Sequence, residues 1–362
     1  MSKTMGDGAA SRHAKRESFL AAAGWDSAPL TPLAGDASTR SYARLRQGEE
    51  NALLMDAPLG GEAASCPPDA DEVERQRLGY NAMARLAGPR MEAFTAVAKW
   101  LNNSGVRAPH IYASDPGQGF ALIQDFGNRH LVDAATDAAA EAALYRRAMD
   151  VLGTIRQQAV IPGDIGGWHL LTYDALVLKT EADLLLDWYV PHLGGVVSDE
   201  MRADWVSAWD ELIDKLGAPD TLVLRDYHAE NILVPDDGPL AVIDFQDALV
   251  GHAPYDVVSL LEDARRDVDL GLAAELYQED RARAPDPGAY GVAFAVLAAQ
   301  RNAKILGIFA RLIHRDNKER YAAFIPRVAR HMARDLERSE VAPLRGWAER
   351  YLPSLLGHLG GV

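Results

Sequence analysis

The chain has 362 residues, a hydrophobic fraction of 48%, a charged fraction of 25% and a formal net charge of −15. These values are typical of globular proteins, and the length allows two domains or one large bilobal domain. The acidic balance argues against nucleic acid as a partner, because binding a phosphate backbone requires a concentrated basic surface. The single cysteine, Cys66, excludes an intrachain disulfide and favours a reducing compartment.

The polar N-terminus lacks the apolar core of a signal peptide, and we expect residues 1–17 to form a disordered tail. A short helix is expected to follow at residues 16–23. No apolar run in the sequence approaches the roughly 20 residues of a membrane-spanning helix. These features favour a cytoplasmic protein without a membrane partner.

Residues 18–127 have the pattern of a small lobe that contains both strands and helices. Alternating or apolar runs bounded by turn residues predict strands at residues 41–46, 51–56, 109–113 and 120–124. Helical periodicity predicts helices at residues 72–87 and 91–104, and the Gly- and Pro-rich stretch before them predicts a loop.

Residues 128–362 are mostly helical by pattern. The expected helices cover residues 138–158, 173–189, 198–216, 257–266, 288–315 and 325–336. The fold class is therefore predicted to be α+β, with a small antiparallel-sheet lobe at the N-terminus and a larger helical lobe at the C-terminus.

The sequence Leu-Arg-Asp-Tyr-His-Ala-Glu-Asn at 224–231 is the most informative segment of the helical part. It is followed by a predicted hairpin whose turn is Pro-Asp-Asp-Gly, which brings Asn231 close to Asp244. Phosphoryl transfer from ATP uses one carboxylate to orient the attacking hydroxyl, and an amide and a second carboxylate to hold the metal. We therefore predict Asp226 as the catalytic base, with Asn231 and Asp244 as Mg²⁺ ligands.

A loop of small residues at 35–41, Gly-Asp-Ala-Ser-Thr-Arg-Ser, lies between two predicted strands. Such a loop lets backbone N–H groups approach phosphates, so we expect it to cover ATP. The expected contacts come from Gly35, Ser38, Thr39 and Arg40. Strand 51–56 carries no lysine to hold the phosphates, and we expect Arg40 or Arg44 to supply that charge.

The tripeptide Asp125-Phe126-Gly127 matches the metal-binding tripeptide of protein kinases, but it precedes Asp226 in the chain, whereas the metal segment must follow the catalytic loop. We interpret it instead as the hinge between an N-terminal nucleotide-binding lobe, 18–127, and a helical lobe, 128–362. The backbone at Gln124, Asp125 and Phe126 is expected to bind adenine.

Several polar residues of the helical lobe admit two interpretations. His228 is either a packed loop histidine or a residue that orients Asp226 or contacts the substrate. Arg265 and Arg301 belong either to solvated faces that form salt bridges or to a pocket for an anionic or polyhydroxylated acceptor. Asp256 is expected to be structural, either as a helix N-cap or as a buried carboxylate that accepts hydrogen bonds from the catalytic loop.

With these residues in place, the chain resembles the aminoglycoside phosphotransferase-like family of small-molecule kinases, from about Leu33 to Arg334. Within the family it looks most like the bacterial N-acetylmuramate/N-acetylglucosamine anomeric kinases of cell-wall recycling. The segments that carry this resemblance are 35–42, 54–58, 226–231, 244–248, 263–268, 300–302 and 307–312.

The resemblance implies a bilobal protein-kinase-like fold, ATP under the 35–41 loop, and phosphoryl transfer to the anomeric hydroxyl of an amino sugar. If the acceptor is N-acetylmuramate, its lactyl carboxylate is expected to meet Arg265 or Arg301. Two alternatives stay open. One is a kinase of another alcohol, such as an aminoglycoside, choline or homoserine. The other is a nucleotide-binding pseudokinase regulator, which the missing lysine suggests and the intact set of Asp226, Asn231 and Asp244 argues against.

Overall fold

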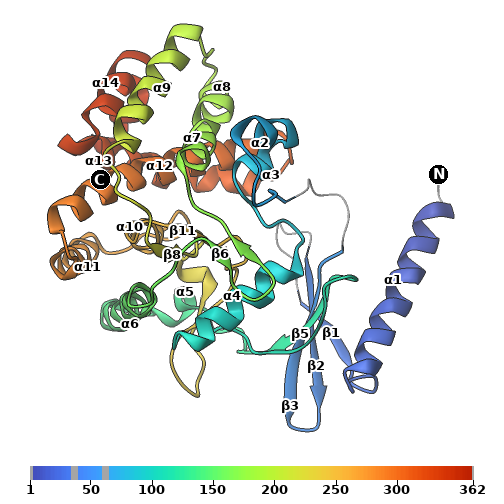
Figure 1. Cartoon of the computed structure of the whole chain (residues 1–362). Helices are drawn as coiled ribbons and strands as arrows, with labels where there is room; N and C mark the ends of the chain where they lie inside the picture. The colour runs from blue at the N-terminus through green and yellow to red at the C-terminus, as the bar shows by residue number, and fades with distance from the viewer. Residues whose placement is uncertain (1–2, 34–39, 59–64, 361–362) are drawn as a thin grey trace.

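A computed structural model describes residues 3–33, 40–58 and 65–360 (Figure 1). The N-terminal part contains a five-stranded antiparallel sheet in the order β1-β2-β3-β5-β4. The strands are β1 (Leu30–Pro32), β2 (Ser41–Gln47), β3 (Glu50–Asp56), β4 (Ile111–Asp115) and β5 (Phe120–Gln124). The predicted strands and the α+β class are confirmed.

Successive side chains of a strand point to opposite sides of the sheet, and apolar side chains are buried on both sides of this one. On one face Leu54 and Leu122, which are register partners, pack with Phe19 of the N-terminal helix. On the other face Met55 and Ile123 join the core that contains helix α4 (Met91–Asn103).

The N-terminal segment differs from its prediction, since Lys3–Ala22 forms helix α1 rather than a disordered tail. The helix has little amphipathic pattern, so the sequence did not predict it. Its contacts with the sheet explain its order: Arg12 bonds Asp56 at 3.0 Å from Nε and lies 3.8 Å from the ring centroid of Phe120. Phe19 stacks on the same phenylalanine ring at 5.5 Å between centroids.

The expected single helix at 72–87 is two short helices, α2 (Glu72–Leu78) and α3 (Tyr80–Met83). Gly79 separates them, with φ of 95°, a conformation that favours glycine. In Figure 1 both helices lie away from the sheet, beside helices α7 (Ala175–Ala182) and α12 (Pro287–His314).

The C-terminal part is mostly helical, as predicted. Its other α-helices are α5 (Leu131–Ala134), α6 (Ala138–Arg156), α8 (Val190–His192), α9 (Asp199–Ile213), α10 (Pro254–Leu261), α11 (Leu270–Arg283), α13 (Ile325–Leu336), α14 (Ala342–Tyr351) and α15 (Pro353–Leu356). Helices α11 and α14 were not predicted from the sequence.

Three two-stranded sheets interrupt these helices. They are β6 (Gly163–Asp164) with β7 (His169–Leu170), β8 (Thr221–Val223) with β11 (Leu249–Gly251), and β9 (Ile232–Leu233) with β10 (Ala241–Val242). The last pair is the predicted hairpin, in which Val242 pairs with Ile232.

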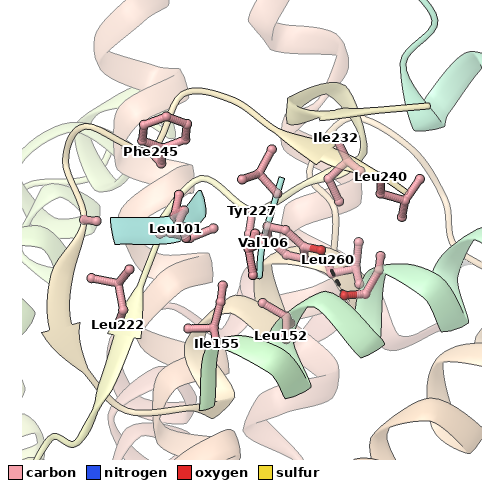
Figure 2. Packing of buried hydrophobic residues seen from close by; sticks show 14 of the residues in the cluster. Leu101, Val106, Leu152, Ile155, Leu222, Tyr227, Ile232, Leu240, Phe245 and Leu260 are labelled. Carbon is pink, nitrogen blue, oxygen red and sulfur yellow. Dashed lines mark hydrogen bonds between the residues drawn. The ribbon is translucent and has the colours of Figure 1, made fainter. Parts of the chain in front are cut away.

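The core of the C-terminal part holds the catalytic segments in place. Figure 2 shows Tyr227, Ile232 and Phe245 packed near Leu152 of α6 and Leu101 of α4. The Tyr227 hydroxyl donates to the carbonyl oxygen of Ala148 at 2.9 Å. Each of these three buried residues directly follows a predicted active-site residue in the sequence. The apolar core therefore fixes the backbone that carries the predicted active-site groups.

Helix α12 is long and apolar enough, among the described residues, to cross a membrane by length and composition, but 83% of that window is buried in the structure. It is therefore a core helix of this fold. Its polar residues, Gln300, Arg301, Asn302 and Lys304, are buried as well, so the interpretation of Arg301 as part of a solvated face is wrong.

Candidate active site

The predicted catalytic loop runs from the end of β8 to Asn231, and Asp256 supports its backbone. This carboxylate accepts hydrogen bonds from the backbone N–H of Leu224 at 2.7 Å and of Arg225 at 3.0 Å. Burial raises the pKa of Asp256 to about 7, although these two N–H bonds act in the opposite direction. Asp256 therefore has the second of its two predicted structural roles, that of a buried carboxylate that supports the loop. It is not the N-cap of α10, because Ala253 occupies that position.

Two residues of the site have left-handed backbone conformations, Arg225 with φ of 71° and Asp244 with φ of 60°. Aspartate tolerates this region better than most residues, whereas arginine pays a steric cost. The Arg225 side chain has compensating contacts: it is buried, forms an ion pair with Glu181 and donates to the carbonyl oxygen of Ala84 at 3.1 Å.

The hairpin brings the three predicted groups together. Asn231 Nδ2 donates to the backbone oxygen of Asp226 at 2.9 Å and lies 3.5 Å from Asp244 Oδ2. The backbone N–H of Ile243 bonds the carbonyl of Asn231 at 3.0 Å, which fixes the two segments side by side. Gln246 Nε2 holds the other carboxylate oxygen of Asp244 at 3.0 Å.

The two carboxylates differ in their proton affinity. Burial tends to raise the pKa of Asp226, but the positive charges of Lys304, Arg225 and Arg301 outweigh it and lower that pKa below the ordinary value. Burial raises the pKa of Asp244, and the negative charge of Asp226 adds to this shift. Asp226 is therefore ionised at neutral pH.

The predicted phosphate loop lies partly outside the described residues, which do not include Gly35, Ser38 and Thr39. Arg40 is described: its Nη1 lies 3.9 Å from Asp244 Oδ1, and its Nη2 donates to the carbonyl oxygen of Gly88 at 2.8 Å. The Arg40 guanidinium thus faces the predicted metal aspartate.

Arg44, the other candidate for a phosphate contact, is directed elsewhere. It forms an ion pair with Asp125, with one bond of 3.0 Å, and donates to Asn128 Oδ1 at 2.8 Å. Asp125 also accepts from the backbone N–H of Gly127 at 2.9 Å. Arg44 therefore connects the second strand of the sheet to the predicted hinge segment.

The other hinge residues lie at the end of the sheet. The backbone N–H of Gln124 bonds the carbonyl oxygen of His110 at 2.8 Å. The ring of Phe126 packs with Leu233 and Ala241 of the hairpin, under the guanidinium of Arg107 at 4.7 Å.

His228 and Arg265 contact each other beside the catalytic loop, with 2.9 Å between Arg265 Nη1 and His228 Nε2. Arg265 also forms an ion pair with Glu230 at 3.1 Å. Burial, followed by the charge of Arg265, lowers the pKa of His228 to about 4, so the imidazole is neutral at pH 7. Nδ1 of His228 is buried and has no hydrogen-bond partner among the described residues.

Arg301 is buried on α12, with 4% of its surface exposed, and its charge acts on both Asp226 and Asp256. In the part of the chain that the structure describes, its Nη1 lacks a hydrogen-bond partner. A buried donor without a partner is costly, which makes this atom a candidate for contact with a bound acceptor.

Sequence reasoning missed a buried network of Glu181, Arg225, Lys304 and Tyr173. Glu181 binds Arg225 and, at 2.9 Å, Lys304 Nζ. Burial raises the pKa of Glu181, but these two cations outweigh it and lower the pKa to about 2. Lys304 lies three positions after Arg301 and so on the same face of α12. This spacing was the sequence signal that could have placed Lys304 beside the candidate site.

The sequence matches the phosphotransferase enzyme family over residues 29–293. It is 42% identical over 357 residues to an N-acetylmuramate/N-acetylglucosamine kinase of Caulobacter vibrioides, which covers 94% of this chain and 97% of that protein. A protein of the same name from Pseudomonas aeruginosa is 33% identical, over 87% of this chain and 86% of the relative.

Solved structures of low sequence identity have the same fold. A choline/ethanolamine kinase family protein from Mesorhizobium loti superposes with a TM-score of 0.56 at 15% identity, over 93% of this chain and 98% of that one. A thermostable mutant of an aminoglycoside phosphotransferase, in complex with ADP and hygromycin B, gives 0.54 at 16% identity, over 88% and 98%. These structures confirm the predicted kinase-like fold, and the sequence match shows that the chain belongs to the phosphotransferase enzyme family.

Proposed function

We propose that this chain is an ATP- and Mg²⁺-dependent kinase that phosphorylates the anomeric hydroxyl of N-acetylmuramate or N-acetylglucosamine, in the cytoplasm during cell-wall recycling. The observation that carries the phosphotransfer chemistry is the convergence of Asp226, Asn231 and Asp244. The acceptor is inferred from the names of the relatives that match most of the chain. Residues 124–127 serve as the hinge between the two lobes.

In this mechanism Asp226 is the catalytic base. Its lowered pKa keeps it ionised, so it accepts a hydrogen bond from the acceptor hydroxyl and holds the oxygen in line with the γ-phosphorus. The new oxygen–phosphorus bond forms as the bond from the γ-phosphorus to its bridging oxygen breaks. The hydroxyl proton passes to Asp226, and ADP leaves.

The residues present fit a magnesium ion. Because Asn231 Nδ2 is committed to the Asp226 carbonyl, the amide oxygen Oδ1 is the atom that remains for a metal, and Asp244 supplies a carboxylate beside it. No group of three or more His, Cys, Asp or Glu side chains suited to a metal occurs among the described residues. Phosphate oxygens and water would complete this coordination, and the ion would neutralise charge on the phosphates.

Arg40, rather than Arg44, is the better candidate for the phosphate-binding charge. Its guanidinium faces Asp244, where the metal-bound phosphates would lie, and a guanidinium can bind phosphate oxygens in a bidentate manner. Arg44 is engaged by the hinge.

We expect Arg40→Met to raise the KM for ATP about 10- to 100-fold, the equivalent of one or two charge-assisted hydrogen bonds. Steady-state kinetics with ATP varied would measure this. Arg46→Met is the matched control, because Arg46 lies on the strand that follows Arg40 and is exposed, and it should leave the KM unchanged. An equal KM in the Arg40 variant and the wild type would remove Arg40 from the nucleotide site.

The acceptor is proposed to bind beside Asp226, on the side that carries Arg301 and His228. Both side chains are at least nine-tenths buried, and each has a nitrogen without a partner among the described residues, Nη1 of Arg301 and Nδ1 of His228. Sugar oxygens would satisfy these nitrogens. Arg265 orients His228 and is not expected to be free for the sugar.

The decisive experiment is to incubate the protein with Mg-ATP and each amino sugar and to follow the products by phosphorus NMR. A sugar 1-phosphate signal that depends on the protein is the expected result. A signal only with choline, homoserine or an aminoglycoside would indicate a kinase of another alcohol. Stabilisation by Mg-ATP without transfer to any acceptor would indicate a regulator instead.

A further inference from the structure

The chain between β3 and α4 crosses from the sheet to the helical lobe. In Figure 1 helices α2 and α3 of this segment lie beside α7 and α12 rather than beside the strands that precede them. Asp174, at the start of α7, holds the segment there: it bonds Arg75 Nη1 at 2.6 Å and Arg85 Nη2 at 3.0 Å. Arg85 Nη1 also donates to the carbonyl of Thr172 at 2.6 Å.

Residues 72–87, here called the cross-lobe segment, also contact both halves of the active site. Arg225 of the catalytic loop donates to the carbonyl of Ala84 at 3.1 Å. Asp247, just after the metal segment, accepts from the backbone N–H of Ala87 at 2.6 Å. The cross-lobe segment therefore lies next to the site that would bind the acceptor.

One residue of this segment, Tyr80, faces α12. The guanidinium carbon of Arg311 lies 5.1 Å from the Tyr80 ring centroid. Arg301, Lys304 and Arg311 share one face of α12, since they are spaced at i, i+3 and i+10. Lys304 Nζ lies 2.9 Å from Glu181, and Glu181 pairs with Arg225, the residue before Asp226, so this face of α12 is turned toward the loop that carries the predicted base.

The cations of this face are not equivalent. Lys304 is occupied by Glu181 at 2.9 Å and by the Tyr255 hydroxyl at 3.3 Å. Nε of Arg311 is buried and finds no hydrogen-bond partner within the described ranges. The nearby Asp316 is bonded by Arg315 at 2.7 Å. Arg311 therefore presents a guanidinium whose charge and Nε–H can serve a bound anion.

We propose, on the basis of the proposed amino-sugar kinase function, that Tyr80 and Arg311 form the distal end of the acceptor site and bind a carboxylate substituent of the sugar, the lactyl group of N-acetylmuramate. A guanidinium matches a carboxylate in charge and shape, and an aromatic ring behind it fixes its plane. Arg301 lies one turn of α12 from Lys304, which is linked through Glu181 to the loop of Asp226, whereas Arg311 lies roughly 10 Å further along the helix than Lys304. Arg301 would then contact both sugars, whereas Arg311 would contact only the carboxylate. This proposal replaces the expectation that Arg265 or Arg301 binds the carboxylate.

The test compares kcat/KM for N-acetylmuramate and N-acetylglucosamine in Arg311→Gln. Loss of a charge-assisted hydrogen bond should lower the value for N-acetylmuramate about 10- to 100-fold, while the value for N-acetylglucosamine stays within about threefold. Arg311→Lys should keep part of the preference. Arg315→Gln is the control, because Arg315 lies just after the same helix, is exposed and pairs with Asp316; it should change neither value.

Two further variants separate this role from general damage. Arg301→Met should lower both values by similar factors, and Tyr80→Leu should affect N-acetylmuramate more than N-acetylglucosamine. Equal losses for the two sugars in Arg311→Gln, or no loss, would overturn the inference. Wild-type protein inactive toward both sugars would overturn the proposed function and this inference together, so the two failures can be told apart.

Discussion

Asp226→Asn is expected to lower kcat by about 10²- to 10⁴-fold, the range for loss of a positioned general base. Asparagine is nearly isosteric with aspartate, so the acceptor pocket keeps its shape, but the amide cannot take the hydroxyl proton. The apolar anchors on both sides of the loop, Leu224 and Tyr227, are unchanged. The reduction should therefore appear in the chemical step, measured as the rate of ADP formation at a saturating concentration of the amino sugar.

Nucleotide binding distinguishes this result from misfolding. The melting temperature of Asp226→Asn should rise with Mg-ATP as it does for the wild type, because Asn231 and Asp244 are intact. Asp237→Asn is a suitable control, since Asp237 lies in the turn of the same hairpin and pairs with Arg107 at 2.9 Å. A variant at Asp226 that retains wild-type kcat would disprove the assignment of the base.

Asp244→Asn is expected to weaken Mg²⁺ binding and to reduce kcat/KM for Mg-ATP. Loss of a residue that only orients a metal ligand costs roughly 10- to 100-fold, and loss of the ligand itself should cost more. Asparagine accepts the left-handed backbone that Asp244 adopts at φ of 60°, so the turn is retained while the charge is removed. Substitution by alanine would add a backbone penalty to the loss of the ligand.

A magnesium titration at fixed ATP measures this effect. The Asp244→Asn variant should need a higher magnesium concentration for half-maximal rate, whereas Asp237→Asn should follow the wild-type curve. If both variants shared the wild-type curve, Asp244 could not be a metal ligand.

Local patterns were enough to predict the strands and the catalytic hairpin. Leu54 and Leu122 alternate with residues of the opposite face, and the Pro-Asp-Asp-Gly turn fixes the pairing of Val242 with Ile232. These signals come from neighbours in the chain, so periodicity and turn chemistry predict them.

Contacts between distant segments were not predictable in this way. Helix α1 is held through Arg12 and Phe19, which both contact Phe120, about a hundred positions later. The ion pair of Arg225 with Glu181 and the contact of Tyr80 with Arg311 likewise depend on how α7, α12 and the catalytic loop pack. A buried polar side chain and an exposed one have the same letter in the sequence, so Arg301 and Lys304 could be interpreted as a solvated face until their burial was known.

The attachment of the cross-lobe segment to Asp174 has a mechanical consequence. A lobe joined to its partner at a single hinge can rotate about several axes. Here the connection at 124–127 is supplemented by a second one, through Arg75 and Arg85, at a different place on the helical lobe. Two points of attachment favour rotation about the line that joins them, and we therefore expect opening for nucleotide exchange and opening for the sugar to be one coupled movement.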